Sequence, residues 1–244
     1  MKYPQAMDAV DDKGGPTVTV RMPSGTSDTD LAVTAAQVAQ EVDFCRALCL
    51  KTRSRLTQPD KDIKKYGYRY FFLDPDTDNS KSYKTIDYIV GLIETGLAEK
   101  GLVIKVNSSL DQTQNVTGYV NARPLAFDSN GTEVIKKGKE NGTLVACHDP
   151  SGGTTTKRAG AIHVKLSTIK DVRNGVQTLL HEASHRYGGT HDFGSKGYFN
   201  NSGDCPRNPA EFYLPAQALY NADSYGWFIL KVGRMHGDKL LFSH

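Results

Sequence analysis

The feature that most constrains this chain is a short motif inside a helical pattern, His181-Glu182-Ala183-Ser184-His185. Apolar residues recur at intervals of three and four from 171 to 187, which predicts an amphipathic helix. Four helical residues rise about 6 Å and turn through about 400°, so His181 and His185 project from the same face. Two imidazoles on one face can bind a single zinc ion.

Glu182 is the candidate general base. It follows His181 directly, and its carboxylate can reach a water at the metal, take a proton as that water attacks a carbonyl, and return the proton to a leaving amine. Zinc supplies the rest by lowering the pKa of the water toward ~7 and polarising the carbonyl.

A third ligand is needed, because a catalytic zinc has three protein ligands and one open position. The predicted helix ends at Tyr187-Gly188-Gly189, whose glycines suit a left-handed turn. His191 and Asp192 follow immediately, so either side chain can return toward the metal.

Residues 178–228 resemble the aspzincins, the family of deuterolysin and the fungal peptidyl-Lys metalloendopeptidases. That family has HExxH, then Gly-Thr-x-Asp, then a helix with Asn-Ala-Asp-Ser-Tyr; the matching segments here are 181–185, 189–192 and 221–225. The resemblance implies an α+β zincin-like fold, in which a mixed sheet is backed by helices and the HExxH helix lies beneath a cleft. It also implies that Zn²⁺ is the cofactor, that His181, His185 and Asp192 bind it, and that Glu182 is the base.

Two rival ligands are kept open. His181 to His191 also satisfies the metzincin string HExxHxxGxxH, which makes His191 the ligand and requires a downstream methionine turn, for which Met235 is the candidate. Glu211, just before the last predicted helix, is a more distant alternative.

The chain departs from the aspzincin pattern at the oxyanion donor. The family has a tyrosine three residues after the ligand Asp, where this chain has Ser195. We expect Tyr198 to take that role after a small insertion, the alternative being an ordinary loop tyrosine.

A second departure concerns specificity. Lysine-specific members carry an acidic residue three positions after the Asp of Asn-Ala-Asp, whereas Asp223 is followed at that spacing by Gly226. We expect Asp223 to bind substrate and give a mild preference for a basic residue after the cleaved bond. The alternative is a carboxylate hydrogen-bonded near the metal histidines.

For the rest of the chain we expect an N-terminal arm or edge element over 1–30 and the catalytic domain over 31–244. Other helices are expected over 31–55, 82–100 and 215–232. Strands are expected over 17–22, 66–73, 102–106, 117–122, 143–147 and 160–166. The last of these is expected to be half-exposed and to pair with extended substrate.

Composition excludes several function classes. Thirty basic and 27 acidic residues are scattered along the chain, so no nucleic-acid footprint is visible. No apolar run reaches the ~18 residues of a membrane span, and no secretory signal is visible, so a cytoplasmic protein or leaderless secretion is expected. Four cysteines without a CxxC pair suggest buried free thiols, with one or two disulfides left open.

The sequence therefore predicts a zinc metalloendopeptidase acting on protein or peptide substrates. A bacterial effector or toxin is one setting that fits, and an immunity or delivery protein is then expected as partner. The alternative is a non-catalytic zincin-like binding or adaptor module.

Overall fold

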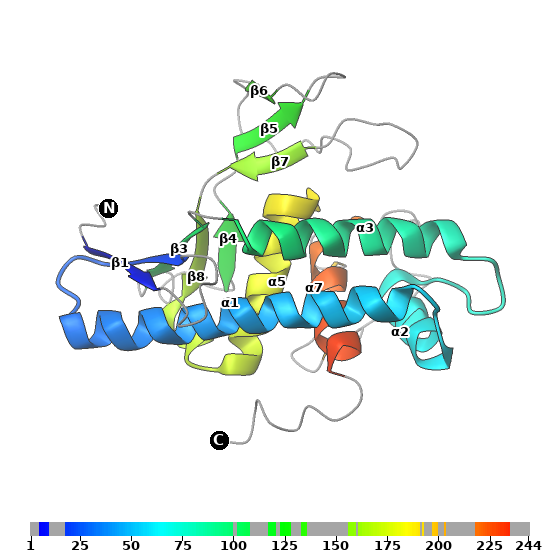
Figure 1. Ribbon diagram of the computed structural model, residues 1–244, viewed down its shortest axis with the longest axis horizontal. Coiled ribbons are helices and arrows are strands. Elements are labelled where there is room, and N and C mark those ends of the chain that lie inside the picture. Colours follow the sequence, from blue (N-terminus) through cyan, green and yellow to red (C-terminus); the bar gives the residue numbers. More distant parts are fainter. Residues whose placement is uncertain are drawn as a thin grey trace.

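The computed structural model describes residues 5–9, 18–99, 102–107, 117–120, 123–127, 133–135, 156–159, 161–190, 192, 197–199, 203 and 218–234. These residues form an α+β fold in which helices pack against a mixed sheet (Figure 1). The expectations for residues 143–147, Cys147 and Cys205 lie outside the described part of the chain. The described cysteines, Cys45 and Cys49, are buried free thiols, as expected.

The main sheet has five strands in the order β1-β2-β3-β8-β4. They are β1 (Gln5–Ala9), β2 (Val18–Met22), β3 (Leu102–Asn107), β8 (Ile162–Lys165) and β4 (Gly118–Val120). β2, β3 and β8 are parallel, while β1 and β4 are antiparallel to their neighbours. A second sheet, in the order β6-β5-β7, contains β5 (Arg123–Phe127), β6 (Glu133–Ile135) and β7 (Thr156–Ala159).

The segment 1–30, expected as an N-terminal arm or edge element, supplies β1 at the edge of the main sheet and β2 between β1 and β3, where Val18, Val20 and Met22 are buried in the core. One expectation about the sheet was wrong. The strand expected to receive substrate, β8, is interior and lies between β3 and β4. It is also not half-exposed, since His163 is only 3% exposed; burial and then the charge of Lys105 lower its pKa to about 4.

The helices are α1 (Asp28–Leu56), α2 (Lys61–Phe71), α3 (Ser80–Leu97), α4 (Leu166–Ile169), α5 (Val172–Gly188) and α7 (Ala222–Gly233). α1 contacts α3, α5 and α7, and spans the width of the view in Figure 1. The predictions for α1, α3 and α5 are confirmed. Side-chain caps start two of them: Ser27 accepts from the Asp30 N–H, and Asp171 accepts from the Arg173 and Asn174 N–H groups.

The segment expected as a strand over 66–73 lies mostly in helix α2. Helix α2 starts after its N-cap residue Asp60, whose side chain accepts a hydrogen bond from the Ile63 N–H. Ile63, Gly67, Tyr70 and Phe71 are buried at helical spacing. Tyr70 and Phe71 of α2 are buried in the core, and Phe71 meets Tyr225 and Phe228 edge to face, at ring-centroid distances of 5.0 and 5.1 Å.

The last helix begins later than expected. α7 starts at Ala222 rather than at residue 215, and residues 219–220 form a turn. The side-chain amide of Asn221, the N-cap residue, donates hydrogen bonds to the Gly197 carbonyl and to Ser224 Oγ. Pro215, expected in the first turn, lies outside the described residues.

None of the helices in the described ranges combines the length and apolar character that a membrane crossing requires.

A buried glutamate joins α1 to the HExxH helix. Glu41 is 2% exposed, receives a hydrogen bond from Gln37, and packs so closely on α5 that a Cβ added at Gly175 would lie 2.5 Å from its Oε2. Burial raises the pKa of Glu41 to about 8, against the effect of the Gln37 hydrogen bond. The folded protein therefore retains a proton that the unfolded chain releases above its ordinary pKa of 4.5.

This proton makes stability depend on pH. Between about pH 4.5 and 8 the free energy of unfolding should fall as pH rises, by at most ~1.4 kcal/mol per unit from this group. Glu41→Gln should remove that slope and stabilise the protein at pH 8 by up to roughly 4 kcal/mol. Urea unfolding of both proteins between pH 5 and 9 measures this, with Glu94→Gln on α3 as the matched control. Equal slopes in the wild type and Glu41→Gln would contradict it.

Candidate metal centre

Helix α5 carries both motif histidines, and a tight turn follows it. His181 and His185 are buried. Gly189 ends the helix with φ +63°, a left-handed conformation that favours glycine, as expected. Thr190 then closes the turn, because its hydroxyl bonds to Ser184 Oγ at 2.7 Å and its N–H donates to the Ser184 carbonyl at 3.2 Å. The chain is thereby reversed toward the two imidazoles.

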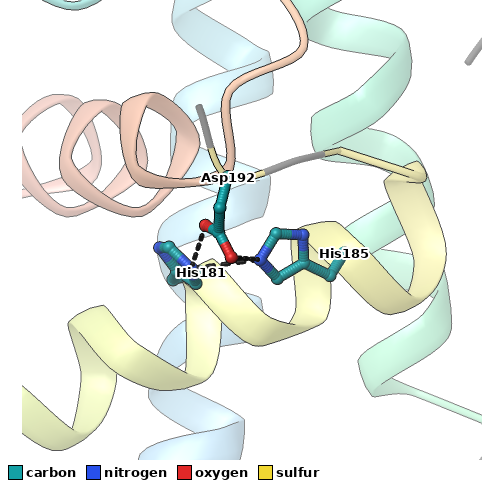
Figure 2. A group of neighbouring side chains, drawn as sticks. All are labelled: His181, His185 and Asp192. Carbon is teal, nitrogen blue, oxygen red and sulfur yellow. Dashed lines mark hydrogen bonds and ion pairs between the residues drawn. The ribbon is translucent and has the colours of Figure 1, made fainter. Parts of the chain in front are cut away.

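Three side chains converge at this turn. Figure 2 shows the carboxylate of Asp192 directed at the two imidazoles from the segment after α5. Its oxygens lie 3.2 Å from His181 Nε2 and 3.3 Å from His185 Nε2, and the two nitrogens are 3.1 Å apart. Zinc lies about 2.0–2.2 Å from such ligands, so tetrahedral ligand atoms are about 3.3–3.5 Å from one another. The residues therefore fit a zinc ion.

The outer nitrogens of the two rings determine which atoms face the site. His181 Nδ1 lies 3.2 Å from Asp223 Oδ1, and His185 Nδ1 lies 2.8 Å from the Thr190 carbonyl oxygen. Both partners are acceptors, so each Nδ1 is the protonated donor and each Nε2 faces the Asp192 carboxylate, to which it donates when protonated and beside which it offers a lone pair to a cation when deprotonated. A cation between them satisfies all three.

The pKa shifts have the same origin. Burial lowers the pKa of His181, but hydrogen bonds to Asp192 and Asp223 outweigh it and hold the pKa well above its ordinary value. Burial raises the pKa of Asp192, yet hydrogen bonds from His181 and His185 outweigh it and hold this pKa well below the usual range. The cluster favours positive charge at its centre, and a metal ion provides it.

Tyr198 also lies at this cluster. Its ring stacks on the ring of His181, with centroids 5.9 Å apart and planes 12° apart, while 45% of the residue stays exposed. Burial of the hydroxyl, the charge of Asp192 and a hydrogen bond to it raise the Tyr198 pKa. The hydroxyl is therefore a protonated donor beside the candidate metal position.

The segment 221–225 holds residues 197–199, the Tyr198 loop, in place. Asn221 Nδ2 donates to the Gly197 carbonyl at 2.8 Å, and the Phe199 N–H donates to Asp223 Oδ2 at 2.6 Å. Asp223 also accepts from Gln177 Nε2 at 2.7 Å, in addition to its contact with His181. These contacts favour the alternative interpretation of Asp223, a buried carboxylate that orients a metal histidine.

Close packing between α5 and α7 explains the glycine at position 226. A Cβ at this position would lie 3.1 Å from Gln177 Nε2 and 3.2 Å from the Gln177 carbonyl oxygen. A side chain there would require Gln177 to shift by a few tenths of an ångström, so close packing of α5 on α7 disfavours the second carboxylate of the lysine-specific pattern.

Glu182 lies in the same cavity as the three ligands. It is 3% exposed, and a Cβ at Gly118 of β4 would lie 3.0 Å from its Oε1. The cavity has a volume of about 500 Å³. Its walls are β4, α5, the start of α7 and the Tyr198 loop, including Gly118, Gln177, Glu182, Tyr198, Asp223 and Trp227. A larger groove of about 1240 Å³ between α1, α2 and α3 shares none of its lining residues.

Sequence analysis missed Gln177, and it included Thr190 and Asn221 in the matching segments without giving them a role. Gln177 could have been found from its position four residues before His181, on the same helix face. The rivals His191, Glu211 and Met235, together with Ser195, lie outside the described residues. Elsewhere in the described ranges, no other group of three such ligands converges.

No protein-family model and no curated protein matches this chain. The geometry of the metal centre therefore carries the functional argument.

Proposed function

We propose that this protein is a zinc-dependent endopeptidase with a zincin-like fold, related to the aspzincins that its sequence resembles. The observation that carries the proposal is the convergence of His181 Nε2, His185 Nε2 and the Asp192 carboxylate at zinc-ligand spacing, with Glu182 in the same cavity. A structural zinc site has no use for a buried carboxylate beside its first ligand.

Each residue has a defined task in this proposal. When bound, zinc supplies a Lewis acid that polarises the scissile carbonyl and acidifies the attacking water. Glu182 accepts the proton of that water and donates it to the leaving amine. Tyr198 donates a hydrogen bond to the oxyanion, and its raised pKa keeps the donor protonated. Asp223 and the Thr190 carbonyl orient the two imidazoles.

The substrate is a protein or peptide, and β4 is the strand that we assign to its binding. β4 is at the edge of the main sheet, and Thr117–Val120 line the metal cavity. An extended peptide can add to such an edge through main-chain hydrogen bonds. Residues 162–166, expected in this role, are one strand further in. A setting as an effector with an immunity or delivery partner remains a prediction from the sequence.

Metal removal tests the proposal. Zinc-loaded protein should cleave unfolded casein. Treatment with 1,10-phenanthroline should lower the rate of cleavage at least ~100-fold, and addition of zinc, but not of magnesium, should restore it. Release of new amino termini and zinc content by atomic absorption are the measurements. Stoichiometric zinc without cleavage of any protein substrate would reject the endopeptidase in favour of a non-catalytic binding module.

A further inference from the structure

Beyond the metal, the cavity continues along the seam between α5 and α7. His181 and Gln177 contact Asp223, and Arg173 lies over the ring of Trp227. The two helices are therefore antiparallel along this seam. Arg173, Gln177 and His181 are spaced by four, as are Asp223, Trp227 and Lys231, so each set forms one helix face.

The far end of this seam is strongly basic. Trp227 is 3% exposed and lines the cavity. The guanidinium carbon of Arg173 lies 5.5 Å from the Trp227 ring centroid, and Lys231 Nζ lies 5.7 Å from the same centroid. The pKa of Lys231 is lowered first by burial and then by the positive charges of Arg173, Arg69 and Arg234. Two cations, Arg173 and Lys231, therefore lie over the ring of Trp227, which lines the end of the cavity.

Neighbouring carboxylates in the described part of the chain do not explain Arg173 and Lys231. Between the residues that the structure describes, neither Arg173 nor Lys231 forms an ion pair. A cation in the last turn of α7 also offsets the helix dipole, but that effect accounts for Lys231 and Arg234 and not for Arg173, which comes from the first turn of α5.

The nearest carboxylate in the cavity is Asp223. It accepts hydrogen bonds from Gln177, Phe199 and His181, so its charge is directed at the metal end of the seam. Eight helical residues separate Arg173 from His181, which places the basic end about 12 Å from the metal centre along the helix. An extended peptide covers that length in three to four residues.

We propose that Arg173 and Lys231 bind a carboxylate of the peptide substrate, three or four residues from the bond that is cleaved. This inference rests on the proposed function and gives it a substrate class: peptides with an acidic residue, or their own carboxyl terminus, at that distance. It concerns a different position from the basic residue, directly after the cleaved bond, that the sequence suggested.

Binding can be measured without cleavage, because Trp227 is the single tryptophan of the chain. The zinc-loaded Glu182→Gln protein is titrated with acetylated, amidated hexapeptides in which one Glu is moved along a neutral sequence, and with matched Gln peptides. We expect one Glu position to bind about tenfold more tightly than its Gln counterpart, with a change in Trp227 fluorescence. The gain should shrink as salt is raised from 50 to 500 mM. A Gln peptide with a free carboxyl terminus separates the two sources of the carboxylate.

Variants decide which residues are responsible. In the Glu182→Gln background, Arg173→Gln with Lys231→Gln should abolish the tenfold preference, while Lys81→Gln at the exposed start of α3 should keep it. Anisotropy of labelled peptides gives these affinities, since the double variant alters the surroundings of Trp227, and circular dichroism verifies folding. Equal affinity for Glu and Gln peptides, or a preference that survives the double variant, would overturn the inference. Failure of the wild type to cleave any peptide rejects the endopeptidase separately, because the titration does not depend on turnover.

Discussion

Replacing Glu182 by Gln should lower kcat/KM for peptide cleavage by about 10³-fold or more while leaving the zinc content unchanged. Loss of a general base typically costs 10²–10⁴-fold, and Glu182 is the buried carboxylate next to His181 in the cavity. Gln keeps the shape of the side chain but cannot accept the proton. Because the proposed ligands are His181, His185 and Asp192, the metal should remain bound.

Single-turnover cleavage of a fluorogenic peptide and zinc analysis of the same samples provide both readouts. Glu94→Gln, half-buried on α3, is the matched control and should retain wild-type activity. Cleavage by Glu182→Gln at the wild-type rate would remove the proposed mechanism. Loss of zinc in this variant would instead make Glu182 a ligand.

Asp192→Ala should weaken zinc binding by more than about 100-fold. Substitution of a residue that hydrogen-bonds to a metal ligand typically costs 10–100-fold in metal affinity, and removal of the ligand itself should exceed that. The variant leaves two Nε2 atoms 3.1 Å apart with no anion to share the charge of the metal. Competition with a chromophoric chelator measures the affinity, and the visible spectrum of the cobalt-substituted protein reports the change in coordination.

His191→Ala is the informative comparison, because His191 is the rival ligand next in sequence. It should keep zinc affinity within a few-fold of the wild type. If His191→Ala loses zinc and Asp192→Ala keeps it, the ligand assignment is wrong, and the metzincin-like alternative takes its place.

Local spacing determined the part of the site that is close in sequence. His181 and His185 share a helix face because of the 3.6-residue period, and Gly189 supplies the left-handed turn that reverses the chain toward Asp192. These features depend on backbone geometry within twelve residues, so the pattern alone predicts them. The helices α1, α3 and α5 follow from the same periodicity and from caps such as Ser27 and Asp171.

Packing decided what lies between distant segments. Tyr70 and Phe71 favour a strand by intrinsic preference, but they are buried as one face of α2 against α7 and the Tyr198 loop. Strand order also depends on packing: alternation in β8 predicts a strand, and only its pairing with β3 and β4 shows that it is interior. The edge position beside the metal cavity thus belongs to β4.

The sequence by itself determined the HExxH helix, its glycine turn and the candidate metal ligands, because each depends on residues a few positions apart. Only the tertiary structure decided that Asp223 contacts His181 and the Phe199 backbone, and that Arg173 and Lys231 both lie near the ring of Trp227. Those contacts join residues some 20 to 60 positions apart, and their partners are set by how α5 and α7 pack, which no local period encodes.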